Sequence, residues 1–261
     1  MPGSRFTDIR RFESIDSTNR YLLEEARRGA LEGVVAVADH QSAGRGRLGR
    51  RWEAPPGSNL LMSVLLRPDL PAGQRHLACG VVALAAVDAV ASVTGLVVGI
   101  KWPNDLLGPD GRKLAGVLAE TDVVGSPAGR TLRAPIVVGI GLNVNWPEHD
   151  RDLPAELLGT ATSLRQQVGR PVDRSELFHA LLDALGPRAV DLESDPGRAR
   201  QAGEFRARCT TIGAPVRVEL ADGAFEGLAT DLTPEGHLVV EVGGARRTVV
   251  TGDVVHVRTT G

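Results

Sequence analysis

The chain contains very little cysteine and histidine relative to its 261 residues, and each scarcity argues against a class of protein. Its two cysteines, Cys79 and Cys209, lie far apart and fit predicted helical segments, so neither a disulfide framework nor a zinc knuckle is indicated. The six histidines are scattered without an H-x-x-x-H spacing, which argues against a zinc site. A reducing cytoplasm is therefore the expected compartment.

The chain also has no excess of positive charge and no apolar segment at its N-terminus. The net charge is -2 and the pI about 6.3, which argues against nucleic acid as the principal partner. The first eleven residues carry charges without an apolar run, and Gly80 and Asp88 interrupt the most apolar stretch, 77–93. We therefore expect no secretion signal and no membrane span. Only about sixteen residues precede Ser17, too few for a DNA-binding helix-turn-helix module.

Positive charge is supplied almost entirely by arginine, with 28 arginines against two lysines. The lysines, Lys101 and Lys113, are twelve residues apart, in the segments KWPND and RKLAG. An ammonium group is a compact point charge with movable donors, which the planar guanidinium does not supply. The two lysines are therefore candidates for chemistry, although chance clustering is the alternative.

A cluster of glycine and arginine, GRGRLGRRW at 44–52, forms the second candidate site. Glycines permit close backbone approach, and arginines offer forked donors to phosphate or carboxylate oxygens. This segment, the Gly/Arg loop, is predicted to bind an anion. Taken alone, it is equally typical of a solvated linker or an RNA-binding segment.

Hydrophobic content of 42% over this length predicts a large core and one large domain, with room for a second small one. Periodicity and turn residues then place the elements. The expected helices cover 17–28, 74–94, 175–193, which is broken or kinked near Gly186–Pro187, and 197–208. The expected strands cover 34–38, 59–66, 97–101, 112–120 and 134–144, with a polar connection over 125–133.

After Gly213 the pattern changes to short alternating strands separated by glycine-containing turns, which predicts a small all-β barrel. The strands are expected at 216–220, 225–232, 237–242, 246–250 and 254–258. We accordingly divide the chain into a domain of residues 1–212 and a C-terminal domain of residues 213–261.

Five motifs occur in an order that resembles the biotin protein ligases. They are STN at 17–19, QSAGRGRLGR at 41–50, KWPND at 101–105, KLAG at 113–116 and GIGLN at 139–143. The resemblance extends from about Phe12 to the end of the chain and implies the bacterial form without a DNA-binding domain. The fold it implies is α+β, a mixed sheet flanked by helices in a class II synthetase-like ligase domain, followed by an SH3-like barrel.

The resemblance also implies an activity. Biotin and ATP, the latter with Mg²⁺, would form biotinoyl-5'-AMP and pyrophosphate, and a lysine of a biotin carboxyl carrier protein would then attack the activated acyl carbon and expel AMP. Cations and backbone donors must offset the negative charges that the first step brings together. Some relatives carry a basic residue where this chain has Leu48, which leaves the affinity of the loop open.

Roles for individual residues follow from the same resemblance. The expected catalytic residues are Lys113 as the main electrophile, Arg45 and Asp105, with Asp105 either near magnesium or accepting a proton from the carrier lysine, and no metal ligand is assigned. The expected biotin-binding residues are Ser17, Thr18, Asn19, Gln41, Gly44, Arg45, Gly46, Arg47, Lys113, Gly116 and Gly139, and the expected ATP- or adenylate-binding residues are Arg45, Arg47, Arg50, Trp52, Asn104, Lys113 and Asn143.

Several alternatives stay open at this level. Residues 17–19 are also a normal helix cap, and glycine inside a strand also marks a bulge. A lipoate or octanoate transferase would modify a carrier lysine too, and a binding module without turnover would keep the same pocket. The sequence leaves homodimer formation open as well.

Overall fold

The computed structural model describes residues 5–121, 133–220, 223–250 and 252–256, and residue 72 only in its backbone. Its main element is a seven-stranded mixed sheet in the order β1-β2-β3-β7-β6-β5-β4. The pair β1 and β2 is parallel, and every other pair is antiparallel. In sheet order the strands are β1 (Asp8–Ile15), β2 (Val34–Gln41), β3 (Leu60–Leu66), β7 (Ile136–Leu142), β6 (Lys113–Thr121), β5 (Asp105–Leu107) and β4 (Gly99–Lys101).

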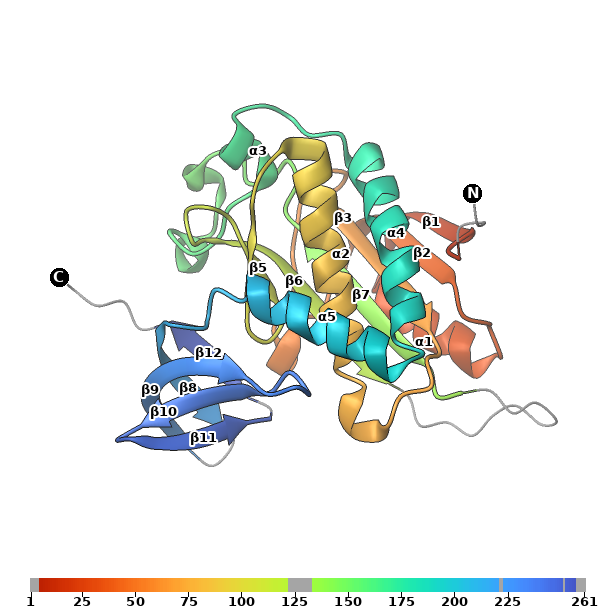
Figure 1. Ribbon diagram of the computed structural model, residues 1–261. Helices are drawn as coiled ribbons and strands as arrows, with labels where there is room; N and C mark the ends of the chain where they lie inside the picture. Colours follow the sequence, from red (N-terminus) through yellow and green to blue (C-terminus); the bar gives the residue numbers. More distant parts are fainter. Residues whose placement is uncertain (1–4, 122–132, 221–222, 251, 257–261) are drawn as a thin grey trace.

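Helices cover both faces of this sheet (Figure 1). On one face, Leu22 and Ala26 of α1 (Thr18–Arg27) pack with Leu65 and Val137. On the other, buried side chains of α2 (Leu77–Thr94), α4 (Arg174–Asp191) and α5 (Asp195–Arg208) join those of alternate strand residues in the main core. The period of two along each strand thus divides the core between the two faces.

Helix α2 is the scaffold of the larger core, with ten buried residues. By length and composition it is the one helix among the described residues that qualifies as a membrane span, and 61% of it is buried inside the structure. Arg188 of α4 ties the helices together, because it donates to Asp88 of α2 and to Gln201 and Glu204 of α5.

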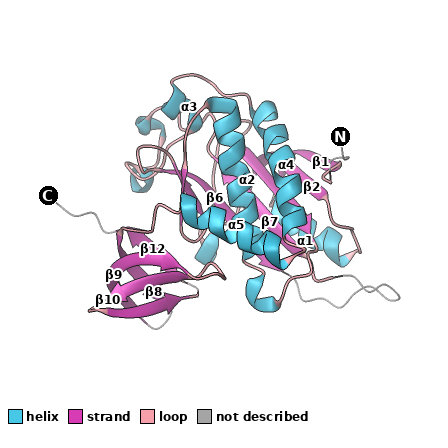
Figure 2. Cartoon of the chain, in the orientation of Figure 1, coloured by secondary structure: helices cyan, strands magenta, loops and turns pink. Residues whose placement is uncertain are grey.

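A second sheet follows α5 and has five antiparallel strands in the order β11-β10-β9-β8-β12 (Figure 2). This confirms the expected α+β class, a mixed sheet flanked by helices with a C-terminal SH3-like unit. The strands are β8 (Pro215–Leu220), β9 (Gly223–Leu232), β10 (Leu238–Val242), β11 (Ala245–Val249) and β12 (Asp253–His256).

Some expectations need correction. The expected strands 97–101 and 112–120 carry the two lysines and follow each other in the predicted order, so they could be neighbours in the sheet. In the structure they are not neighbours, because the short strand β5 lies between β4 and β6. Helix α4 continues through Pro187, since its apolar face is buried along its length against α2. Strand β1 and the short helix α3 (Leu164–Val168) were not expected. The 125–133 connection lies outside the described residues except at its end, and the last strand is described only as far as His256.

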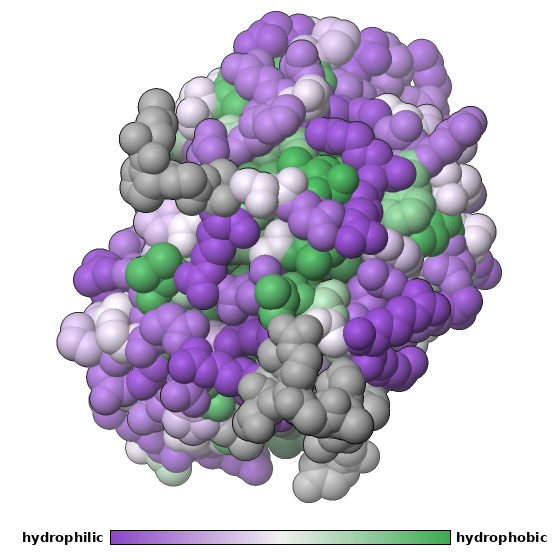
Figure 3. All heavy atoms as spheres, turned by 90° about the vertical axis from the view of Figure 1, so that its right-hand side faces the viewer, coloured by the Kyte–Doolittle hydropathy of each residue, from purple (hydrophilic) through white to green (hydrophobic). Residues whose placement is uncertain are grey.

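The surface agrees with the composition. The face shown in Figure 3 is mostly hydrophilic, with hydrophobic side chains gathered near its centre. Both cysteines are free: Cys209 is buried and Cys79 partly so. Burial raises the pKa of the Cys79 thiol to about 12, so this thiol stays protonated and unreactive.

Candidate active site

A cavity of about 1260 Å³ lies where the sequence motifs meet. It opens on the sheet face that carries α1. Gly116, Gly139 and Gly141 supply no side chain to this face, so the sheet surface is thinned where the cavity meets it. Of the residues expected to bind ligand, the cavity is lined by Ser17, Thr18, Asn19, Gln41, Arg45, Gly46, Arg47, Arg50, Trp52, Lys101, Asn104, Asp105, Lys113, Gly116, Gly139 and Asn143.

Gly44 does not line the cavity, and the structure gives it another role. A Cβ at Gly44 would overlap the backbone carbonyl of Trp52, to which the chain returns after the loop. The amide of Trp52 also donates to the carbonyl of Gly44 at 3.0 Å. Gly44 therefore closes the base of the Gly/Arg loop.

The start of α1 presents its polar residues to one end of the cavity. Ser17 is the N-cap, and its hydroxyl accepts from the amide of Arg20 at 3.4 Å. Gln41 Oε1 accepts from the amide of Thr18 at 2.8 Å, which joins the helix to the end of β2. Ser17, Thr18 and Asn19 are all buried despite being polar. Residues 17–19 can therefore cap the helix and contact a ligand at the same time, because the capped end of the helix faces the cavity.

A cationic centre forms another part of the cavity wall. The Nζ atom of Lys113 is 2.8 Å from Oδ1 of Asp105, and Asp105 pairs in register with Lys101 on β4. Burial lowers the pKa of Lys101, and the nearby carboxylates of Asp105 and Asp253 oppose that shift. Asp105 thus pairs directly with Lys113 and acts on Lys101 only at longer range, so the two ammonium groups favour an anion here.

The Gly/Arg loop brings three guanidinium groups to this centre. Arg45 Nη1 is 3.1 Å from Glu120 Oε1, and Arg47 Nη1 donates to Asn104 Oδ1 at 3.1 Å. Arg50 pairs with Asp253 of β12. Leu48 turns the loop with φ +56°, a left-handed conformation for a non-glycine residue, and its side chain is 72% exposed.

Trp52 packs across the glycine-thinned sheet. A Cβ at Gly141 would lie 2.6 Å from the indole Nε1, and one at Gly116 would lie 3.2 Å from Cζ3. The indole Nε1 is buried without a hydrogen-bond partner among the described residues. Lys113 Nζ lies 5.7 Å from the centre of the indole ring, a cation–π contact. Trp52 thus joins the loop to both the sheet and the central lysine.

Asn104 and Asn143 hold the walls. Asn104 donates to the carbonyl of Val117 at 2.8 Å. Both ends of the Asn143 amide are used internally, since Oδ1 accepts from Asn59 at 3.1 Å and Nδ2 donates to the carbonyl of Thr162 at 2.9 Å. Asn143 therefore contributes chiefly by fixing the wall.

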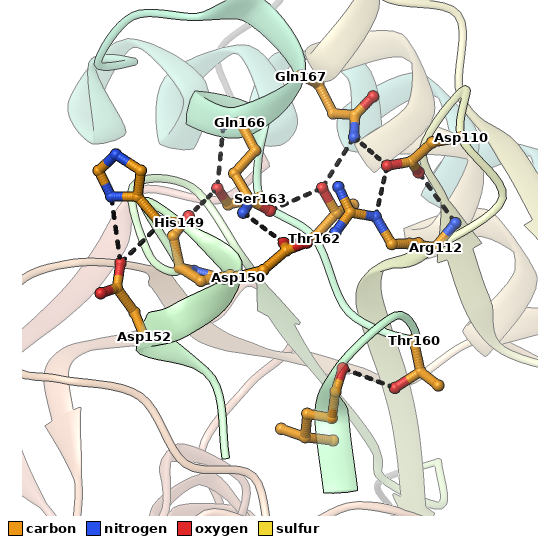
Figure 4. Close-up of polar contacts among 12 residues, drawn as sticks. Asp110, Arg112, His149, Asp150, Asp152, Thr160, Thr162, Ser163, Gln166 and Gln167 are labelled. Atoms are coloured by element: carbon orange, nitrogen blue, oxygen red, sulfur yellow. Dashed lines mark hydrogen bonds and ion pairs between the residues drawn. The ribbon is translucent and has the colours of Figure 1, made fainter. Parts of the chain in front are cut away.

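Sequence reasoning missed another part of the rim. A polar network joins the turn before β6 to the segment that ends in α3 (Figure 4). Arg112 donates to Asp110 at 2.6 Å and to Asp150 at 2.7 Å, and Gln167 donates to Asp110 at 2.6 Å. Asp110 and Arg112 line the cavity. Only the tertiary structure links Asp110 and Arg112 to Asp150 and Gln167, which are far away in sequence and match none of the motifs.

Ser63, Glu120, Asp253 and His256 were also missed. Ser63, Asp253 and His256 line the cavity, and Glu120 contacts Arg45 and Asn19. The signal available for Glu120 was its strand period, which places it on the same face as Gly116. Within the described residues no group of three or more histidine, cysteine or acidic side chains is arranged to hold a metal ion.

Comparisons with known proteins agree with this geometry. Residues 11–143 match the Biotin/lipoate A/B protein ligase family, and residues 211–257 match the Biotin protein ligase C terminal domain. The chain is 38% identical to a biotin–[acetyl-CoA-carboxylase] ligase of Mycobacterium tuberculosis, over 98% of this chain and 91% of the relative. It is 32% identical to the bifunctional ligase/repressor BirA of Escherichia coli, over 92% of this chain and 71% of the relative.

A solved structure is similar over nearly the whole chain. It is the biotin protein ligase of Aquifex aeolicus in complex with biotin and ATP, with a TM-score of 0.80 and 27% identity. The similarity covers 97% of this chain and all of that one, so the fold and both sheets have a counterpart there.

Proposed function

The chain belongs to the biotin/lipoate A/B protein ligase family, and on this premise we propose how its cavity works. The protein is a biotin–[biotin carboxyl-carrier protein] ligase. It uses ATP to convert biotin to biotinoyl-5'-AMP with release of pyrophosphate, and it then joins the biotinoyl group to a lysine amine with release of AMP. The observation that carries the assignment is the convergence of both lysines and the four loop arginines on the cavity that Ser17–Asn19 also line.

The two ends of the cavity suit the two ends of biotin. Thr18, Asn19 and Gln41 provide neutral donors and acceptors for the polar ureido group, with Ser17 at the helix cap. Gly116 and Gly139 let the side chains of Trp52 and Asn19 lie directly against the sheet, which leaves room in the cavity for the ring system. The carboxylate would then point to Lys113 and the Gly/Arg loop, where an anion is favoured.

Lys113 serves as the main electrophile of the first step. It donates to the biotin carboxylate and to the α-phosphate as charge develops, and Arg45 and Arg47 hold the remaining oxygens. Asp105 is released from Lys113 as these anions bind, which frees it to accept a proton from the carrier lysine. The loop closes over the mixed anhydride and excludes water.

The nucleotide lies along the loop. Arg50 reaches the triphosphate, Asn104 lies beside the phosphates and their Mg²⁺, and Trp52 offers its unpaired indole N–H to a ligand acceptor. Backbone groups of Gly46 can approach phosphate closely because no side chain intervenes. Mg²⁺ enters with ATP as part of the substrate.

We further propose the division of labour between domains. Residues 1–212 bind biotin and ATP, and residues 213–261 help to seat ATP or the carrier, since Asp253 and His256 line the cavity. The partner is the carrier domain of acetyl-CoA carboxylase. Nucleic acid and membrane are not partners in this proposal, the compartment is the cytoplasm, and any homodimer would form beside the Gly/Arg loop.

ATP–pyrophosphate exchange, run separately with biotin, lipoate and octanoate, tests the proposal. Exchange with biotin alone is the expected result. Exchange with lipoate or octanoate would move the chain to the other branch of the family, and binding of biotin without exchange would make it a binding module.

A further inference from the structure

Glu120 of β6 contacts two elements of the site at once. Its Oε2 accepts from Asn19 Nδ2 at 2.7 Å, and its Oε1 lies 3.1 Å from Arg45 Nη1. Its side chain is 23% exposed. A carboxylate has an acceptor on each side, so it serves both donors simultaneously, whereas an amide has only one acceptor atom.

The contact with Glu120 fixes the amide orientation of Asn19. The carbonyl of Leu118 accepts the second Nδ2 hydrogen of Asn19 at 3.2 Å. Both Nδ2 hydrogens of Asn19 therefore point at oxygens that can accept but not donate. The Asn19 Oδ1 atom consequently faces Ser63 and accepts its hydroxyl hydrogen at 2.6 Å.

The chain of hydrogen bonds continues from Ser63 to the cavity wall. Ser63 has only one hydrogen, so its oxygen must accept from the Thr18 hydroxyl, which lies at 2.6 Å. The Thr18 hydrogen serves Ser63 and also Gln41 Oε1, which lies 3.0 Å from the Thr18 hydroxyl oxygen, so it is committed within the protein and the remaining lone pair is an acceptor. Gln41 Oε1 accepts from both the amide and the hydroxyl of Thr18, which leaves the Nε2 group of Gln41 as a donor. One acceptor and one donor match the N–H and C=O groups of a ureido ring.

We propose that Glu120 is a positioning residue that orients the hydrogen-bond chain from Asn19 through Ser63 to Thr18 for ureido recognition, while holding Arg45 of the Gly/Arg loop. This role rests on the proposed biotin specificity of the cavity. It couples the two ends of the site, because the same carboxylate contacts the ureido-binding helix and the carboxylate-binding loop.

Biotin titration by calorimetry without ATP tests the role. Glu120→Gln is expected to weaken biotin binding at least about fivefold, because its single oxygen must serve either Asn19 or Arg45. In an Arg45→Ala background that competition disappears, and Glu120→Gln should then change the affinity less than about twofold. An equal loss in both backgrounds, or no loss in either, overturns the role.

A matched control separates positioning from general stability. Glu193 also pairs with an arginine, Arg133, at 2.6 Å, and its side chain is 28% exposed, but it lies outside the cavity. Glu193→Gln should leave biotin affinity unchanged. In exchange assays Glu120→Gln should raise the KM for biotin more than the KM for ATP, and an equal rise in both contradicts the proposal. Titration of the unmodified chain separates the two failures. If that chain binds no biotin, the proposed function itself fails; if it binds biotin normally, the variants test only the role of Glu120.

Discussion

The Nη2 atom of Arg47 donates to the backbone carbonyl of Gly252 at 2.9 Å, and this bond joins the Gly/Arg loop to the C-terminal sheet. Three residues along the loop, Arg50 pairs with Asp253. The C-terminal sheet thus contacts the Gly/Arg loop directly. Side chains that would hold an adenylate are already occupied by protein partners, which places them near their working positions.

This link predicts the behaviour of the loop under limited trypsin digestion. Asp253→Asn removes the charge that holds Arg50, so cleavage after the loop arginines should quicken about two- to fivefold, the effect of one partly exposed ion pair. Biotin with ATP should slow cleavage of the unmodified chain, because the ligands order the loop. Glu219→Gln, on exposed β8, is the control and should change nothing. Equal cleavage with and without ligands would contradict an ordering loop.

Replacement of Lys113 should stop the first half-reaction. Lys113→Ala is expected to reduce biotin-dependent ATP–pyrophosphate exchange more than about a hundredfold, on the order of 3 kcal/mol, because a donor to the developing charge is lost. Lys113→Arg should also be impaired, since a planar guanidinium does not replace a compact ammonium. Near-normal exchange by the alanine variant, with an unchanged melting temperature, would remove Lys113 from the mechanism.

The packing of Trp52 on Gly141 gives a steric prediction. Gly141→Ala places a Cβ 2.6 Å from the indole Nε1, so the ring must move away from the sheet. We expect the affinity for the adenylate to fall about tenfold or more and the tryptophan fluorescence to change, with little loss of fold stability. Gly186→Ala, on α4 with open space around the new methyl group, is the matched control. Unchanged affinity would show that the ring position is not needed.

Stability should depend on pH through His256. Burial, and then the charge of Lys101, lower its pKa in the folded state, so the unfolded chain binds the proton more readily. The free energy of unfolding is therefore expected to decrease as the pH falls through about 6.5, the ordinary value for histidine, and to be fully restored above it. Urea unfolding at pH 7.5 and 5.5 measures this. His256→Gln should flatten the decrease, whereas His179→Gln on the exposed face of α4 should not; equal slopes would exclude His256.

Much of the fold followed from local pattern. Gly95 with φ +75° ends α2 where the sequence indicated, and Ser17 caps α1. Short, nearly continuous apolar runs predicted β3 and β7 closely, because central strands buried on both faces are strongly apolar. Strand β5 was not predicted because three residues are too few to show a periodic pattern. Helix α4 continues through Pro187 because burial of its apolar face outweighs the backbone hydrogen bond that proline cannot donate.

The sequence by itself determined which residue types the site would contain. Two retained lysines, a Gly/Arg segment and a polar helix cap are chemical facts that no fold alters. Only the tertiary structure decided their contacts. Asp105 lies against Lys113, Glu120 lies between Asn19 and Arg45, and β12 lies beside the loop, because strand register and domain packing bring together residues that are distant in sequence and share no motif.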